Sequence, residues 1–134
     1  MRVFLDTNVL VAAFATRGLC ADVLRTVLAE HELITGEVVL AELRDVLARR
    51  IKLPPGTVAD IVALLRAQEV VPKPAKPSDL LLRDLDDRWI LASAVAGGAD
   101  VLVTGDQDLL AIAQQAPLTI LNPRGLWDRL RSGG

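Results

Sequence analysis

Apolar residues fall into two kinds of segment that alternate along the whole chain. Short, near-continuous apolar runs are typical of buried strands and occur at residues 3–5, 32–35, 70–71, 101–104 and 119–121. Longer segments with apolar residues every three or four positions predict helices at residues 8–15, 21–30, 38–49, 58–68, 88–96, 109–115 and 123–131. This alternation predicts an α/β fold in which helices cover both faces of a parallel sheet.

Turn-forming residues mark the boundaries between these segments. Three residues from Pro54 to Gly56 interrupt the chain, and Thr57 is predicted to cap the helix that follows. Prolines at positions 72, 74 and 77 predict an extended connector after the third strand. No fixed-period repeat or change of composition divides the chain, so we expect one domain over residues 1–131 and a flexible tail at residues 132–134.

Composition narrows the class of protein further. The chain has 134 residues, of which 51% are apolar, and a net charge of −2, which excludes nucleic-acid binding through bulk positive charge. A single cysteine, Cys20, excludes an internal disulfide and a multi-cysteine metal site. The apolar runs are too short to span a bilayer, and the N-terminus lacks a signal-peptide pattern, so we expect a soluble cytoplasmic protein without membrane contact.

Two of the predicted strands end on aspartates. Asp6 directly follows the first strand, and Asp106 comes just after the fourth. A carboxylate at the end of a buried strand loses solvation and protonates unless something compensates its charge. Ligands of parallel sheets bind beyond the carboxyl ends of the strands. If the first and fourth strands are neighbours, these two acids therefore share one site.

Acids on two predicted helices extend this set. Glu42 lies at the edge of its helix's apolar stripe, and Asp87 stands at the start of the fifth helix, with Asp84 and Asp86 as alternatives beside it. Converging carboxylates repel one another unless they take up protons or a divalent cation. A site with oxygen ligands only favours Mg²⁺ or Mn²⁺ over Zn²⁺, and such ions suit phosphoryl chemistry.

The order and spacing of these acids resemble the PIN domain family of metal-dependent ribonucleases, particularly VapC-type toxins. The similar segments extend over nearly the whole chain and lie at residues 5–8 (LDTN), 40–43 (LAEL), 87–94 (DRWILASA) and 103–110 (VTGDQDLL). The resemblance implies a three-layer α/β/α, Rossmann-like PIN fold around a mostly parallel five-stranded sheet. It also implies an antitoxin partner that blocks the acidic cleft, and a homodimer.

Residue by residue, the resemblance assigns a catalytic and metal-binding quartet to Asp6, Glu42, Asp87 and Asp106. Asp108 resembles an additional metal-binding acid, and Asn8 and Thr104 resemble polar residues that orient the carboxylates. The implied reaction is hydrolysis of an RNA phosphodiester by a water that Mg²⁺ or Mn²⁺ activates. The chain would then be the toxin of a type II toxin–antitoxin pair.

Several alternatives remain open on the sequence alone. Asp6 and Asp108 are each suited to cap the helix that follows, and Asp86 competes with Asp87 for the third acidic position. The basic residues between positions 44 and 52 suit an RNA path or a solvated surface, and the two tryptophans favour core or interface roles over base stacking. A non-catalytic PIN-fold interaction module is a second function class. An aspartate-nucleophile phosphatase is a third, although Asn8 stands where that chemistry wants a second acid.

Overall fold

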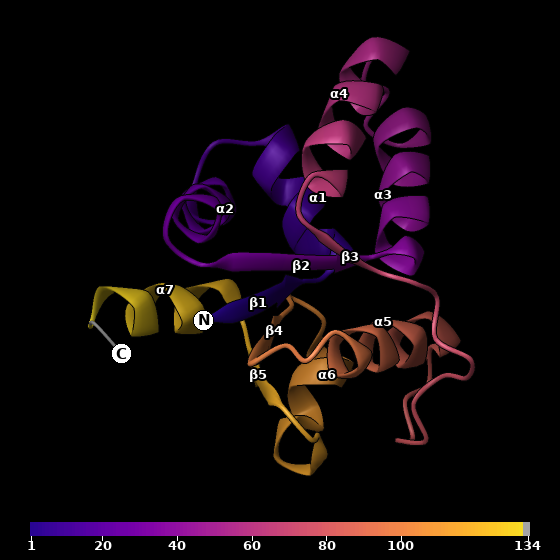
Figure 1. Cartoon of the computed structure of the whole chain (residues 1–134), viewed down its shortest axis with the longest axis vertical. Coiled ribbons are helices and arrows are strands. Elements are labelled where there is room, and N and C mark those ends of the chain that lie inside the picture. The colour runs from indigo at the N-terminus through magenta and orange to yellow at the C-terminus, as the bar shows by residue number, and fades with distance from the viewer. Residues whose placement is uncertain (133–134) are drawn as a thin grey trace.

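A five-stranded parallel sheet forms the centre of the molecule (Figure 1). The computed structural model describes residues 1–132, so the predicted tail beyond Ser132 lies outside the described residues. The strand order is β3-β2-β1-β4-β5. The strands are β1 (Arg2–Leu5), β2 (Glu32–Gly36), β3 (Glu69–Val71), β4 (Val101–Val103) and β5 (Thr119–Leu121). All five strand predictions are confirmed to within two residues at each end.

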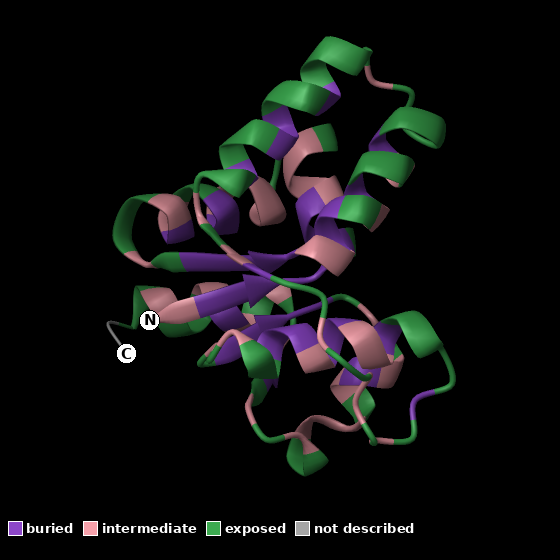
Figure 2. Ribbon diagram, turned by 45° about the vertical axis from the view of Figure 1, so that its right-hand side comes forward, coloured by how far each residue is buried: buried purple, intermediate pink, exposed green. Residues whose placement is uncertain are grey.

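Helices cover both faces of this sheet, which confirms the predicted three-layer α/β/α architecture. The helices are α1 (Thr7–Ala15), α2 (Leu19–Glu30), α3 (Glu37–Arg49), α4 (Pro55–Arg66), α5 (Leu85–Ala96), α6 (Gln107–Ala111) and α7 (Pro123–Arg131). Helices α1 to α4 lie on one side, α5 and α6 lie on the other, and α7 packs against α2 and β5 (Figure 1). Burial follows these layers, with the sheet strands buried and the outward faces of α3 and α4 exposed (Figure 2).

Local predictions failed at three helix ends, where capping chemistry differs from the expected pattern. Helix α4 begins at Pro55, so Thr57 lies inside the helix and does not cap it. Helix α5 begins three residues earlier than predicted because the side chain of Asp84 accepts from the Asp86 N–H. The helix predicted at residues 109–115 is the short α6 followed by a 3₁₀ turn at Ala113–Gln115.

Strand order reverses between β1 and β4. The chain runs outward from β1 through β2 to β3 and then returns to the opposite side of β1 to form β4 and β5. In the register of this pair, Leu5 stands beside Val103, and both are fully buried. The reversal creates the crevice in which open α/β sheets bind ligands. The two strands that precede Asp6 and Asp106 are therefore neighbours, which is the condition under which these acids share one site.

The connector at residues 72–84 is irregular but attached to α5. Leu82 is 3% exposed, and its carbonyl accepts a hydrogen bond of 3.0 Å from Arg88 Nε. The Ser78 N–H donates to the Arg88 carbonyl at 3.1 Å. These contacts attach the connector to the first turns of α5.

Within residues 1–132, no single helix is long and apolar enough to cross a membrane. Helices α1 and α2 reach that length and composition only as a pair, and they meet at an angle of 103°.

Candidate functional site

Asp6 is held at the end of β1 by hydrogen bonds to both carboxylate oxygens. Its Oδ1 accepts from the Thr7 N–H at 2.7 Å, and its Oδ2 accepts from the Thr104 hydroxyl at 2.7 Å. The first contact caps α1, as one alternative from the sequence proposed. The side chain is only 4% exposed. Asp6 can therefore cap α1 and belong to an acidic site at the same time.

Thr104 and Asn8 connect Asp6 to the turn after β4. The Thr104 hydroxyl donates to Asp6 and accepts from the Asp106 N–H at 2.9 Å. The Asn8 side-chain amide donates to Asp6 at 3.2 Å, and its carbonyl oxygen accepts from the Gly105 N–H at 3.1 Å. This arrangement fixes the relative position of the two strand-end acids, which is the geometry that a positioning role requires.

Asp106, and not Asp108, caps helix α6. Asp106 Oδ1 accepts from the backbone N–H groups of Asp108 at 2.8 Å and Leu109 at 3.3 Å. The predicted capping role of Asp108 is therefore wrong, because the helix begins at Gln107 and places Asp108 in its first turn. Asp108 instead pairs with Arg83 of the connector at 3.1 Å.

Asp87 joins Asp106 and Asp108 in a cluster that could hold a metal ion. One carboxylate oxygen from each residue lies within 4.8 Å of the other two. Asp87 is 8% exposed, and its Oδ2 is buried without a hydrogen-bond partner. Asp86, its rival for the third acidic position, is exposed. The first turn of α5 thus directs Asp87 inward and leaves Asp86 at the rim.

The four acids of the predicted quartet line one cleft of about 460 Å³. Glu42 reaches it from α3, the helix that packs against α1 and α5. The rim adds further charges, namely Asp45, Arg50, Asp84 and Asp86. The sequence left open whether the basic residues near position 50 line an RNA path or a solvated surface. The direction of α3 brings one of them, Arg50, to this cleft. Asp108 does not line the cleft but adjoins it through the aspartate cluster.

Burial and the charges of neighbouring carboxylates raise the pKa values of three acids in this cleft, Asp87, Asp6 and Glu42. The pKa of Asp87 rises to about 7, mainly through burial and then through the negative charges of Asp106 and Asp6. Burial also raises the pKa of Asp6 against the opposing effect of its hydrogen bonds. The pKa of Glu42 is raised by burial and by the nearby carboxylates. Without a compensating cation, the cleft therefore favours the protonated forms of these three acids.

A divalent cation fits this donor set. The ligands on offer are carboxylate oxygens, which hard cations prefer. The unpartnered Asp87 Oδ2 is a buried acceptor, and such an atom costs about 1–3 kcal/mol unless something pairs with it. Asp106 uses Oδ1 for the helix cap. Within the described residues, no backbone N–H donates to its Oδ2, which leaves that oxygen for a cation.

Comparison with known proteins identifies the class. The family model for the PIN domain matches residues 2–108, and no curated protein sequence matches the chain. The chain belongs to the PIN domain family. The predicted resemblance to that family is therefore confirmed.

Three solved structures, all of bacterial proteins, are similar to this chain in fold. VapBC2 from Rickettsia felis, bound to a DNA fragment from its promoter, is 20% identical with a TM-score of 0.63, covering 91% of this chain and 98% of that chain. Mycobacterium tuberculosis VapC20, a sarcin–ricin loop cleaving toxin, is 20% identical with a TM-score of 0.57, covering 81% and 93%. FitAcB from Neisseria gonorrhoeae is 19% identical with a TM-score of 0.59, covering 91% and 98%. At these identities the likeness establishes the shared fold.

Proposed function

We propose that this protein is a metal-dependent endoribonuclease that forms one domain over residues 1–131. The observation that carries the proposal is the buried acidic cleft at the switch point of the sheet, in which an Asp87 oxygen has no partner. Family membership supports it, because PIN domains of VapC toxins are typically nucleases. The sarcin–ricin loop activity stated for the structurally similar VapC20 supports RNA as the substrate class.

Asp87, Asp106 and Asp108 would hold a Mg²⁺ or Mn²⁺ ion, with Asp6 and Glu42 facing the same cleft. When bound, such an ion lowers the pKa of a water and stabilises the leaving oxygen of a phosphodiester. Thr104 and Asn8 hold the Asp6 carboxylate at the end of β1. The cap of α6 fixes the orientation of Asp106. Arg83 must share or release Asp108 when that acid binds a cation.

The same comparisons support a proposal for the biological setting. VapBC2 and FitAcB are toxin–antitoxin complexes that share this fold. We therefore place this chain as the toxin of a type II toxin–antitoxin pair in the cytoplasm, held inactive by a cognate antitoxin. A homodimer is part of this proposal. An antitoxin-like reading frame next to the gene would support the assignment.

Cleavage of RNA by the purified protein tests the enzymatic proposal. We expect Mg²⁺- or Mn²⁺-dependent cleavage that leaves 5′-phosphate ends and that Asp106→Asn and Asp87→Asn abolish. Asp60→Asn is a matched control, because this exposed acid lies on α4, outside the cleft. Full cleavage by both cleft variants would refute the assignment. If calorimetry shows no Mn²⁺ binding, a non-catalytic interaction module becomes the better explanation.

A further inference from the structure

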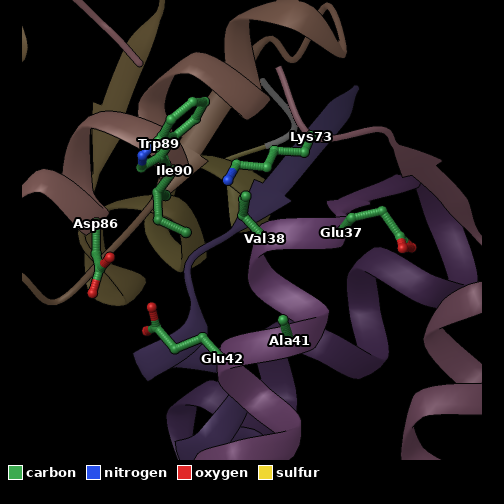
Figure 3. A pocket seen from close by; sticks show the side chains of 8 residues that line it. All are labelled: Glu37, Val38, Ala41, Glu42, Lys73, Asp86, Trp89 and Ile90. Carbon is green, nitrogen blue, oxygen red and sulfur yellow. The ribbon is translucent and has the colours of Figure 1, made fainter. Parts of the chain in front are cut away.

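A second groove lies beside the acidic cleft, and Figure 3 shows the side chains that line it. It has a volume of about 530 Å³, within the range of small-molecule sites. Its apolar wall is formed by Val38 and Ala41 of α3 and by Trp89 and Ile90 of α5. Glu42 and Asp86 line both this groove and the acidic cleft, so the two adjoin at these side chains. A chain bound across the cleft can therefore extend into the groove.

Lys73 and Trp89 form one side of the groove. The Lys73 ammonium lies 4.5 Å from the centre of the Trp89 ring, and Figure 3 shows it directed toward that side chain. Within residues 1–132, no carboxylate forms an ion pair with Lys73. Its contact in the free protein is with the Trp89 ring, while the carboxylates of Glu37, Glu42 and Asp86 line the same groove. An anionic group that binds here must therefore approach on the Lys73 side of the groove.

Trp89 differs from the other aromatic residues of the chain. Phe4 is fully buried, and Phe14 and Trp127 pack against the buried core. Trp89 is half-buried, does not belong to that packed set, and borders the groove. The sequence pattern predicted a core or interface role for it. Trp89 does not pack in the core, and the direction of α5 places its ring beside the site where the proposed reaction occurs.

We propose that this groove binds a base of the RNA substrate. In the free protein, the Lys73 ammonium lies over the Trp89 ring. On binding, Lys73 moves from the ring to the phosphate of a nucleotide next to the scissile bond, and the base of that nucleotide stacks on the ring in its place. Aromatic rings bind bases of single-stranded RNA in this way, and the apolar wall excludes water from the other edge of the base. The inference rests on the proposed nuclease function and adds a substrate-positioning role for two residues outside the acidic set.

A purely structural role is the competing explanation. Lys73 belongs to the connector, so its contact with Trp89 also attaches the connector to α5. In that case, substitutions would lower stability and would change RNA binding only through loss of folded protein. The experiments must therefore distinguish a loss of base binding from a loss of folded protein.

Fluorescence of Trp89 tests base binding directly. Trp127→Phe leaves Trp89 as the only tryptophan and keeps a ring at the substituted position. We expect nucleoside 5′-monophosphates with Mg²⁺ to change the Trp89 emission at saturation, and ribose 5-phosphate, which has no base, to leave it unchanged. Lys73→Ala should weaken the nucleotide response. Equal responses to nucleotide and ribose 5-phosphate, or no response to either, would overturn the proposal.

Cleavage kinetics test the same groove with RNA. Stacking on one ring corresponds to a loss of about 5- to 150-fold in kcat/KM for Trp89→Leu, with recovery in Trp89→Phe. Ala41→Gln should narrow the groove and lower kcat/KM. Ala48→Gln makes the same change at another exposed position of α3, outside the groove, and should not. The proposal fails if Trp89→Leu keeps kcat/KM within about twofold, or if its loss matches the loss of folded protein.

The two proposals can fail separately. If the protein cleaves no RNA but nucleotides still change the Trp89 emission in a base-dependent way, the nuclease assignment fails and the groove remains a nucleotide site. If RNA cleavage requires Asp106 but is indifferent to Trp89 and Ala41, the nuclease stands and the groove assignment fails.

Discussion

Protonation of Asp87 should control the stability of the metal-free protein. The pKa of this carboxyl is about 7 in the folded state, against an ordinary value of 3.8, so the folded state binds the proton more tightly. The resulting stability is fully present below the unfolded pKa and is lost as the pH rises through about 7. Asp87→Asn removes this titration and leaves a side chain of similar shape.

The size of the effect follows from the two pKa values. Between about pH 5 and about pH 8, the titration of Asp87 alone should lower the free energy of unfolding by about 3 kcal/mol. Asp6 and Glu42 also have raised pKa values, so the variant should keep a smaller dependence of the same sign. At the higher pH, Asp87→Asn should be more stable than the wild type by about 1–3 kcal/mol, because it has no buried negative charge at this position. The buried amide still lacks a hydrogen-bond partner, and this limits the gain.

Urea unfolding in EDTA at the two pH values measures this difference. Asp60→Asn serves as the surface control and should follow the wild type. Adding Mn²⁺ at the higher pH should restore stability to the wild type by binding the folded state, and much less to Asp87→Asn. Equal pH dependence in the wild type and Asp87→Asn would refute the reasoning, because it would show that Asp87 ionises normally in the folded protein.

Three further predictions concern individual contacts. Thr104→Val removes the hydroxyl that joins Asp6 to the Asp106 N–H and should cost about 1–3 kcal/mol in denaturant unfolding, whereas an unchanged midpoint would contradict this. Gly97→Ala adds a Cβ 2.7 Å from a neighbouring side-chain methyl and should cost about 1–3 kcal/mol. Gly56→Ala, in open space on α4, should stabilise the folded protein by about 0.4–1 kcal/mol. Thermal melting tests both substitutions, because Gly97→Ala should lower the melting temperature and Gly56→Ala should raise it. Mn²⁺ should raise the melting temperature of the wild type and not that of Asp106→Asn; an equal rise would remove Asp106 from the ligand set.

Local sequence patterns determined the elements and the family. Apolar runs such as residues 3–5 and 101–103 form strands because burial on both faces requires near-continuous apolar side chains. The position of Asp6 and Asp106 beyond those strands was also evident from the sequence. The residues that determine such features lie within a few positions of one another. They are therefore visible without the fold, although helix ends such as those of α4 and α6 were misplaced.

Which of these residues lie close together depends on the tertiary structure. Nothing local to Asp86 or Asp87 shows which one turns inward, because that depends on how α5 packs on β2 and β4. The pairing of Asp108 with Arg83 and the position of Trp89 beside Lys73 likewise depend on the connector. Sequence spacing fixes the chemistry that each element carries. Packing between distant elements fixes which groups share a cleft, and burial in that cleft shifts their pKa values.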